Sequence, residues 1–409
     1  MQDNRIRAYA RLTARVGANV QKGQGAVIVT QPEACEFARL VAEECYLAGA
    51  GWVEVSYQDQ TLDRLGYQYQ KLSTLCRVPK HTRERQRFLN RELPCEIHIL
   101  CEDPDGLCGV DEHTMSVVRS RRGKVLKPLR DARENKNQWT IVAVPSEKWA
   151  KKVFPDCSEK EAVEKLWDAI LSAARVHDEE PEKAWAAHNE RLASRGARMS
   201  EYAFRSIRIQ SASTGTDLRV GLMDEGLWLG GAEKTVGGVI FNPNIPTEEV
   251  FTTPKRLCAE GFVAATRPLS FMGQVIDGFS FEFKDGRAVS CRAKRGQALL
   301  EKMIALDEDA NALGEVALIG KDSPINESGL LFYETLFDEN ASCHLALGMG
   351  FTNTVPGFET MTREELTARG VNDSVHHTDF MIGADDLRVT GKTRGGEEVC
   401  VFENGLWKF

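Results

Sequence analysis

Six side chains of the kinds that bind divalent metals lie between residues 249 and 379. Carboxylate oxygens and imidazole nitrogens in this number can hold one divalent ion, or two ions that share a bridging carboxylate. The residue types therefore favour a metal-dependent hydrolase with a two-metal centre. The candidate ligands are Glu249, Glu315, Glu339, His344, His377 and Asp379.

The spacing of these residues supports a shared site only in part. His377 and Asp379 are two residues apart, so on a strand both side chains would point to the same face. Glu248 precedes Glu249, and on an extended chain only one of the two faces inward. No pattern as specific as HExxH is present. The spacing alone leaves a second interpretation open, in which these are surface carboxylates and hydrogen-bonded histidines.

The candidate ligands lie in short segments that resemble strand ends and turns, and further segments with alternating apolar residues surround them. This pattern predicts an α+β metal-binding carboxy-terminal domain rich in antiparallel strands, covering residues 241–409. Helices are expected at residues 296–305 and 326–337. The alternating segments are residues 279–283, 288–293, 386–391 and 398–407.

The first 145 residues alternate apolar runs with helical patterns, which predicts an α/β domain with an open, mostly parallel sheet. We place this domain at residues 1–240, with helical character at 159–195 and a hairpin at 206–222. No glycine-rich fingerprint follows the strands, so no nucleotide site is indicated. The strands are expected at residues 25–30, 52–57, 96–101 and 138–144, and the helices at 33–49, 61–75 and 111–137.

Composition narrows the class of protein. The chain of 409 residues has a formal charge of -8, which argues against nucleic acid or an anionic membrane as a partner. No apolar run is long enough to span a bilayer, and the amino terminus lacks a signal-peptide pattern. We therefore expect a cytoplasmic protein. The 11 cysteines form no CxxC pair and are expected to be reduced, with Cys343 a small buried residue.

Several motifs occur in one order along almost the whole chain, and together they resemble the thermophilic aminopeptidase T family, the M29 metallopeptidases. In the amino-terminal half the matching segments are EDPDGLCGVD, LKPLRD, QWTIVAVPSEKWAKKVFP and GTDLRVGL. In the carboxy-terminal half they are FNPNIPTEEVFTTP, GEVALIG with SPIN, SGLLFYETLFDENASCHLALG, and HTDFMIG followed by GLW.

This resemblance implies an aminopeptidase that releases amino acids from the amino terminus of peptide substrates. It also implies a homodimer with an enclosed cavity. The family's metal ligands fall on the six residues named above, with Glu249 preferred over Glu248 and His377 over His376. They would hold two divalent metal ions, and zinc, cobalt and manganese all suit such mixed nitrogen and oxygen ligation.

The sequence departs from the family pattern at Phe351, where the resemblance leads us to expect a tyrosine seven residues after His344. A phenol can bind metal or donate a hydrogen bond to a tetrahedral intermediate, and phenylalanine can do neither. The alternative interpretation is therefore a catalytically weakened or inactive member that binds metal and peptide. Tyr333 is the residue that we consider as a substitute hydroxyl.

Overall fold

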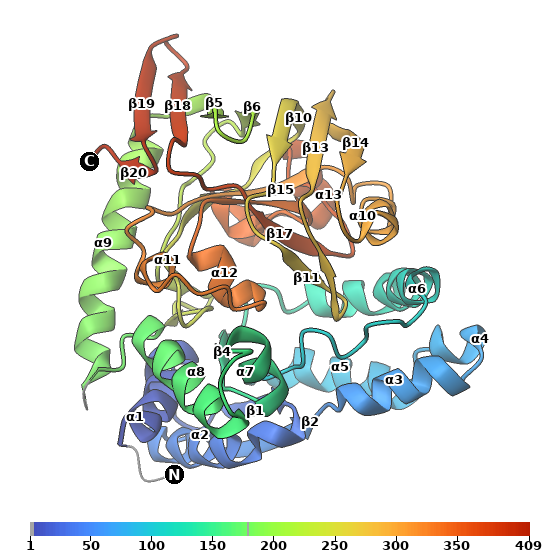
Figure 1. The fold of residues 1–409 in the computed structure, drawn as a ribbon. Coiled ribbons are helices and arrows are strands. Elements are labelled where there is room, and N and C mark those ends of the chain that lie inside the picture. Colours follow the sequence, from blue (N-terminus) through green and yellow to red (C-terminus); the bar gives the residue numbers. More distant parts are fainter. Residues whose placement is uncertain (1–3, 178–179) are drawn as a thin grey trace. The chain divides into compact units, whose positions relative to one another are not determined.

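In the part of the chain that the structure describes, residues 4–177 and 180–409, the amino-terminal strands form a four-stranded parallel sheet (Figure 1). The structure is a computed structural model. The strands run in the order β2-β1-β3-β4, and every neighbouring pair is parallel. The predicted open parallel sheet is thus confirmed. Its strands are β1 (Gly25–Thr30), β2 (Trp52–Tyr57), β3 (Cys95–Leu100) and β4 (Trp139–Ala143).

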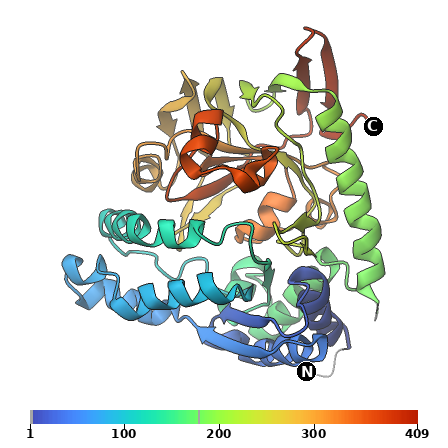
Figure 2. The same ribbon diagram turned by 180° about the vertical axis from the view of Figure 1, so that it is seen from behind.

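Helices pack on both faces of this sheet because its strands carry apolar side chains on both sides. Figures 1 and 2 show these helices from opposite sides. The helix after β1 packs on β1 and β2 and ends at Gly49, whose φ of 105° suits a residue without a Cβ. On the other face, Trp52 packs against Phe88, with ring centroids 5.9 Å apart.

The four predicted strands of this half are all present, but the helices differ from the prediction. A helix rich in charged residues, α5, was not predicted, and the predicted helices 61–75 and 159–195 are each divided in two. The predicted helix 111–137 ends at Asp131. The helices of this half are α1 (Asn4–Leu12), α2 (Cys35–Ala48), α3 (Gln60–Tyr69), α4 (Leu72–Leu75), α5 (Lys80–Glu92), α6 (Glu112–Asp131), α7 (Glu147–Val153), α8 (Glu159–Ala173) and α9 (Pro181–Glu201).

The chain forms two compact units, and neither is continuous in sequence. The amino-terminal unit comprises residues 1–190, 231–247 and 330–336, and the carboxy-terminal unit the remaining residues. The short segment 330–336 belongs to the first unit, where the Trp149 indole donates a hydrogen bond to the Phe332 carbonyl. A domain boundary near residue 240 stays a prediction. No helix among the described residues combines the length and apolar character needed to cross a bilayer.

Antiparallel sheets dominate the described carboxy-terminal unit, as predicted. The larger sheet has the order β14-β13-β10-β6-β5-β18-β19-β20, and a four-stranded sheet has the order β17-β16-β15-β9. The strands of this unit are β5 (Phe204–Ser211), β6 (Thr216–Leu222), β9 (Val250–Thr252), β10 (Pro254–Ala264), β11 (Leu269–Phe271), β12 (Gln274–Ile276), β13 (Ser280–Lys284), β14 (Arg287–Arg292), β15 (Leu313–Leu318), β16 (His344–Gly348), β17 (His377–Met381), β18 (Arg388–Thr393), β19 (Glu398–Glu403) and β20 (Leu406–Trp407). The short strands β7 (Glu233–Lys234) and β8 (Ile240–Phe241) belong to the amino-terminal unit.

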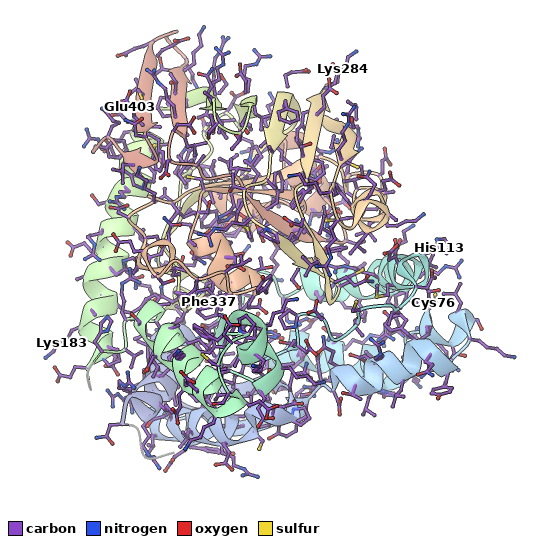
Figure 3. The ribbon with its side chains drawn as sticks, viewed as in Figure 1. Cys76, His113, Lys183, Lys284, Phe337 and Glu403 are labelled. Atoms are coloured by element: carbon purple, nitrogen blue, oxygen red, sulfur yellow. The ribbon has the colours of Figure 1, made fainter. Side chains whose placement is uncertain are left out.

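One apolar core joins the two sheets of this unit. Ile209 and Phe281 of the larger sheet share a cluster of buried side chains with Val316 and Leu345 of the four-stranded sheet. Figure 3 labels Phe337, which is fully buried, and Lys284, which lies at the surface of this unit. Because strand side chains alternate between faces, one face of each sheet enters the core and the other is left for other contacts.

The predicted single helix at residues 326–337 is wrong. The chain instead forms α11 (Pro324–Glu327) and α12 (Thr335–Asn340), separated by an irregular segment. Gly329 stops the first helix with a φ of 67°, which an α-helix does not accommodate. The remaining helices are α10 (Gln297–Met303), close to its predicted place, and α13 (Arg363–Arg369).

Candidate metal centre

The face of the four-stranded sheet that is turned away from the core carries most of the candidate ligands. Val316, Leu345 and Phe380 point into the core from β15, β16 and β17. The alternation of strand side chains therefore places Glu315 and Asp379 on the opposite face, where both are paired in register with Ala346. His377 and Asp379 share this face, as their spacing predicted.

Two groups of three side chains meet on this face among the described residues. In one group the ligand atoms of Glu249, Glu315 and His344 lie within 4.8 Å of one another, and in the other those of Glu315, His377 and Asp379 do. His344 Nε2 lies 3.2 Å from a Glu249 oxygen, and His377 Nε2 lies 3.0 Å from a Glu315 oxygen. Glu315 belongs to both groups, which is the place of a bridging carboxylate.

The hydrogen bonds of the two imidazoles fix which nitrogen faces the carboxylates. His377 Nδ1 lies 2.7 Å from the Met349 carbonyl, and His344 Nδ1 lies 3.1 Å from the Glu339 carbonyl. A carbonyl oxygen only accepts, so each Nδ1 donates its proton. In the neutral ring Nε2 then carries the lone pair, and a backbone partner on Nδ1 is usual for metal-binding histidines.

Glu339 approaches the same region from α12. Its carboxyl group does not belong to either group of three ligands. Burial raises the pKa of this carboxyl group well above its ordinary value, and the nearby charge of Asp379 raises it further. The next residue, Asn340, accepts a hydrogen bond from the Glu248 amide at 2.8 Å. This bond fixes the backbone just before Glu249. Glu248 is itself largely buried, so both glutamates of this pair are withdrawn from solvent.

The charges of the centre suit a cation. Burial raises the pKa of Glu315 to about 7. Burial also opposes ionisation of Asp379, but the charge and hydrogen bond of His377 outweigh it and lower its pKa to about 2. Burial disfavours the charged form of both imidazoles, yet the surrounding carboxylates raise the pKa of each well above its ordinary value. Protons on His344 and His377 thus supply positive charge that a divalent ion can replace.

A glycine without room for a side chain supports this arrangement. The register of β15 shifts between Leu313 and Glu315, which is a bulge at Gly314. A Cβ on Gly314 would lie 2.3 Å from the Met349 carbonyl oxygen, the atom that accepts the bond from His377. The missing side chain therefore allows this carbonyl to reach its position.

Two residues beside the candidate ligands have structural partners. His376 is buried, with Nδ1 2.9 Å from the Thr378 hydroxyl and Nε2 3.1 Å from the Ala310 carbonyl. Both of its nitrogens are thus occupied. Cys343 is also buried, as predicted, and burial raises the pKa of its thiol to about 12.

Comparisons with known proteins show the family of this chain. The family model of the thermophilic metalloproteases (M29) matches residues 2–407. The chain belongs to this family. It is 37% identical to aminopeptidase AmpS of Bacillus subtilis over 99% of this chain and 98% of the relative. It is 39% identical to aminopeptidase T of Thermus aquaticus over 98% of both chains.

A solved member of the family has the same fold. The structure described as wild-type AmpT from Thermus thermophilus superposes with a TM-score of 0.88 at 37% identity, covering 99% of each chain. The thermophilic metalloproteases are peptide hydrolases, and so is this chain.

Phe351 lies directly at the candidate centre of this family member. Its ring centroid is 4.8 Å from that of His377 and 5.3 Å from that of Phe251. The position at which we expected a family tyrosine therefore contacts a candidate ligand and offers it no hydroxyl. Tyr333 belongs to the amino-terminal unit, where the Lys152 amine lies 5.0 Å from its ring centroid.

Sequence reasoning did not single out several residues that surround the ligands. Gly314 and the Met349 carbonyl act through close approach and a backbone hydrogen bond, which leave no side-chain signal. Asn340 acts through its side-chain oxygen, which accepts from the Glu248 amide, but the sequence does not show that these distant residues meet. Phe251 and Ala317 had a signal: each follows a candidate ligand by two residues of extended chain and so shares its face.

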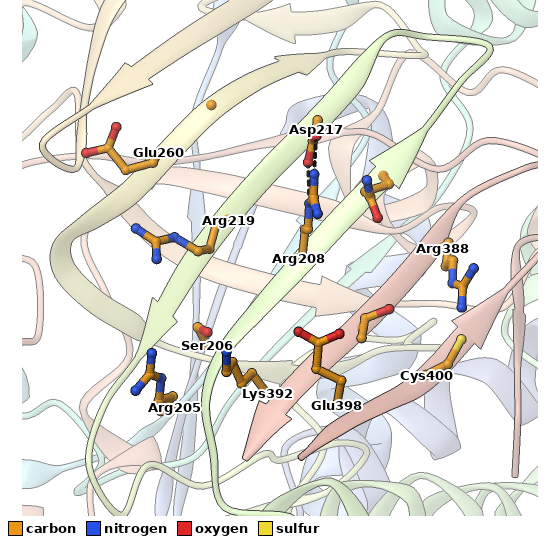
Figure 4. A pocket seen from close by; sticks show the side chains of 13 residues that line it. Arg205, Ser206, Arg208, Asp217, Arg219, Glu260, Arg388, Lys392, Glu398 and Cys400 are labelled. Carbon is orange, nitrogen blue, oxygen red and sulfur yellow. Dashed lines mark hydrogen bonds and ion pairs between the residues drawn. The ribbon is translucent and has the colours of Figure 1, made fainter. Parts of the chain in front are cut away.

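Two large hollows in the described surface are lined by residues other than the candidate ligands. One, of about 760 Å³, lies on the outward face of the larger sheet and is lined by charged residues including Arg208, paired with Asp217 (Figure 4). Another, of about 750 Å³, lies at the carboxyl ends of β1 to β4. Its Asp59 caps α3, and Glu102 accepts from Gln31, so these acidic groups serve local structure.

Proposed function

We propose that the protein is a metal-dependent aminopeptidase that uses two divalent ions. The six residues Glu249, Glu315, Glu339, His344, His377 and Asp379 would hold these ions. The observation that carries the proposal is the pair of ligand groups that share Glu315. Membership of a metalloprotease family and similarity to named aminopeptidases support it.

The donor set fits such ions. It combines buried carboxylates with two imidazoles whose Nε2 atoms face them, and zinc, cobalt and manganese all accept this mixture. When bound, divalent ions supply Lewis-acid chemistry: they polarise the scissile carbonyl and lower the pKa of water. The protein must also accept the proton of the attacking water. Glu248 and Glu315 are the two carboxylates proposed for this step.

The proposed ions favour a free amino terminus as the part of the substrate that the site recognises. Glu249, Glu315, Glu339 and Asp379 place four carboxyl groups in one largely buried region, where their charge would be used to hold the ions. The neutral amino group of a peptide has a lone pair through which it could bind one of these ions. An N-acetylated peptide lacks this group, so the site would bind it poorly. We therefore favour an exopeptidase over an enzyme that cleaves inside a chain.

A second candidate function follows from Phe351. Its ring stands against His377 without a hydroxyl that could donate a hydrogen bond. Loss of one such donor can slow a reaction by about two to three orders of magnitude. The alternative is thus a weakened or inactive family member that binds metal and peptide.

We also propose a cytoplasmic homodimer, which the composition and the family resemblance favour. Within it we propose an amino-terminal domain of residues 1–240 and a catalytic domain of residues 241–409.

Hydrolysis of a dipeptide panel tests the proposed function. Metal-stripped protein would be mixed with cobalt, zinc or manganese, and release of free amino acid from unblocked and N-acetylated dipeptides would be measured. We expect metal-dependent cleavage of the unblocked peptides only.

Two other outcomes would lead to different conclusions. Cleavage of acetylated peptides at similar rates would contradict the aminopeptidase proposal. No cleavage with any ion, by folded and metal-loaded protein, would favour the alternative of a binding protein. In that case a Phe351→Tyr variant that gained activity would assign the defect to the missing phenol.

A further inference from the structure

An apolar cluster shares the sheet face of the candidate metal centre. Phe251, Ala317 and Ile319 are buried together, and Leu229 and Phe351 pack against them with part of their surface exposed. Phe251 in β9 follows Glu249 by two residues, and Ala317 follows Glu315 by two residues within β15. The alternation that places the carboxylates on this face thus places apolar side chains beside them.

The partly exposed members of the cluster are held in place by backbone contacts. Leu229 pairs with Phe251 through two backbone hydrogen bonds of 2.8 and 2.9 Å. The Thr253 hydroxyl accepts from the Phe351 amide and donates to the Phe351 carbonyl, both at 2.9 Å. The Phe351 ring then touches both the cluster and the His377 ring. It therefore forms the border between the apolar cluster and the ligands.

We infer that Phe351, Leu229 and Phe251 form the subsite for the first side chain of the peptide, and that this subsite selects apolar side chains. The inference rests on the proposed function. In an aminopeptidase both the amino group and the scissile carbonyl of the first residue lie at the catalytic centre. Its side chain branches from the carbon between them, so it contacts the surface that borders the ligands. Beside His377, Phe351 and its apolar neighbours form this surface.

The same arrangement disfavours acidic first residues. A glutamate or aspartate side chain would be moved from water onto an apolar surface beside carboxylates, without a cation from the cluster. Leucine, methionine and phenylalanine would instead exchange water for apolar contacts. Because each methylene in such a pocket is worth about tenfold or more, we expect leucine to be preferred over glycine by about 100-fold in kcat/KM.

Selectivity ratios test this subsite. We would measure kcat/KM for unblocked dipeptides that begin with leucine, phenylalanine, glycine and glutamate, using metal-loaded wild type and the variants Phe351→Ala and Leu229→Ala. We expect the ratio of leucine to glycine to fall at least tenfold in both variants. Phe351→Tyr keeps the ring and should keep the ratio, whatever its effect on kcat.

Phe358 offers a matched control, since it is partly buried against a separate cluster that contains Val355 and Leu366. Phe358→Ala should leave the ratio of leucine to glycine within about twofold of wild type. An unchanged ratio in both Phe351→Ala and Leu229→Ala would overturn the inference while leaving the aminopeptidase function intact.

Product binding separates the two proposals. Calorimetry with free leucine and free glycine requires no turnover, and we expect metal-loaded wild type to bind leucine at least tenfold more tightly than Phe351→Ala does. Tighter leucine binding without any hydrolysis would support the subsite and reject the catalytic function. Equal binding of leucine and glycine by wild type would reject the subsite.

Discussion

At the scale of single residues, backbone carbonyls decide how the candidate ligands are used. Met349 and Glu339 each accept a proton from one imidazole Nδ1, which turns Nε2 toward the carboxylates. His376 differs from His377 because the Thr378 hydroxyl and the Ala310 carbonyl engage both of its nitrogens. The orientation of each ring, and not its residue type, therefore separates a candidate ligand from a structural histidine.

The Gly314→Ala variant tests whether the Met349 carbonyl orients the His377 ring. The new Cβ would lie 2.3 Å from the Met349 oxygen, so this carbonyl must move and the His377 ring must move with it. Loss of such a supporting contact typically weakens metal binding about 10- to 100-fold. Competition with a chelating indicator measures this change, and circular dichroism checks the fold.

Gly395→Ala is the control for the glycine substitution, because its Cβ would meet only the Thr393 hydroxyl at 3.8 Å. It should bind metal as wild type does. If Gly314→Ala also binds metal with unchanged affinity, the Met349 carbonyl does not position the candidate ligand.

At the scale of elements, a buried ion pair ties β3 to the segment after α6. Arg133 donates to both oxygens of Glu96, at 2.7 and 3.2 Å, and both side chains are largely buried. Burial alone would raise the pKa of Glu96, but the hydrogen bonds and charge of Arg133 outweigh it, so its pKa is lowered. The stabilisation is therefore present above the unfolded-state pKa of about 4.3 and is lost as pH falls through the folded-state pKa.

Glu96→Gln should lower the free energy of unfolding of the amino-terminal unit by about 2 kcal/mol at pH 7, because it leaves Arg133 buried without its carboxylate. The loss relative to wild type should shrink as the pH is lowered from 5 to 3. Urea unfolding at several pH values measures both effects. Glu92→Gln removes an exposed partner of Arg91 and should change stability little. An equal effect of the two variants would contradict the role of the buried pair.

Elements with a regular pattern were predictable from sequence, and irregular ones were not. The runs at β1 and β2 have apolar residues throughout or in alternation, so their type and place were predicted closely. Helix α5 was missed because its charged sequence carries a single buried residue, Leu89, and so gives a weak apolar stripe. The predicted helix 326–337 failed because Gly329 and the contacts of residues 330–336 override its local propensity.

At the scale of the whole molecule, the candidate site depends on contacts between distant parts of the chain. The ligands come from the residue before β9 and from β15, α12, β16 and β17, which span more than a hundred residues of sequence. The residue types and the shared face of His377 and Asp379 could be predicted. The meeting of the five segments could not, because the pairing of β15 with both β9 and β16 has no local signal. The family resemblance supplied the ligand set that spacing alone left open.

The number of ions held per chain tests the two-metal centre most directly. Native mass spectrometry of metal-loaded protein should show two divalent ions per chain. In the Glu315→Gln variant the binding of both ions should be weakened together, because the two ligand groups share this carboxylate. A wild-type chain that holds one ion, or a Glu315→Gln variant that holds two ions as tightly as wild type, would contradict the shared two-metal centre.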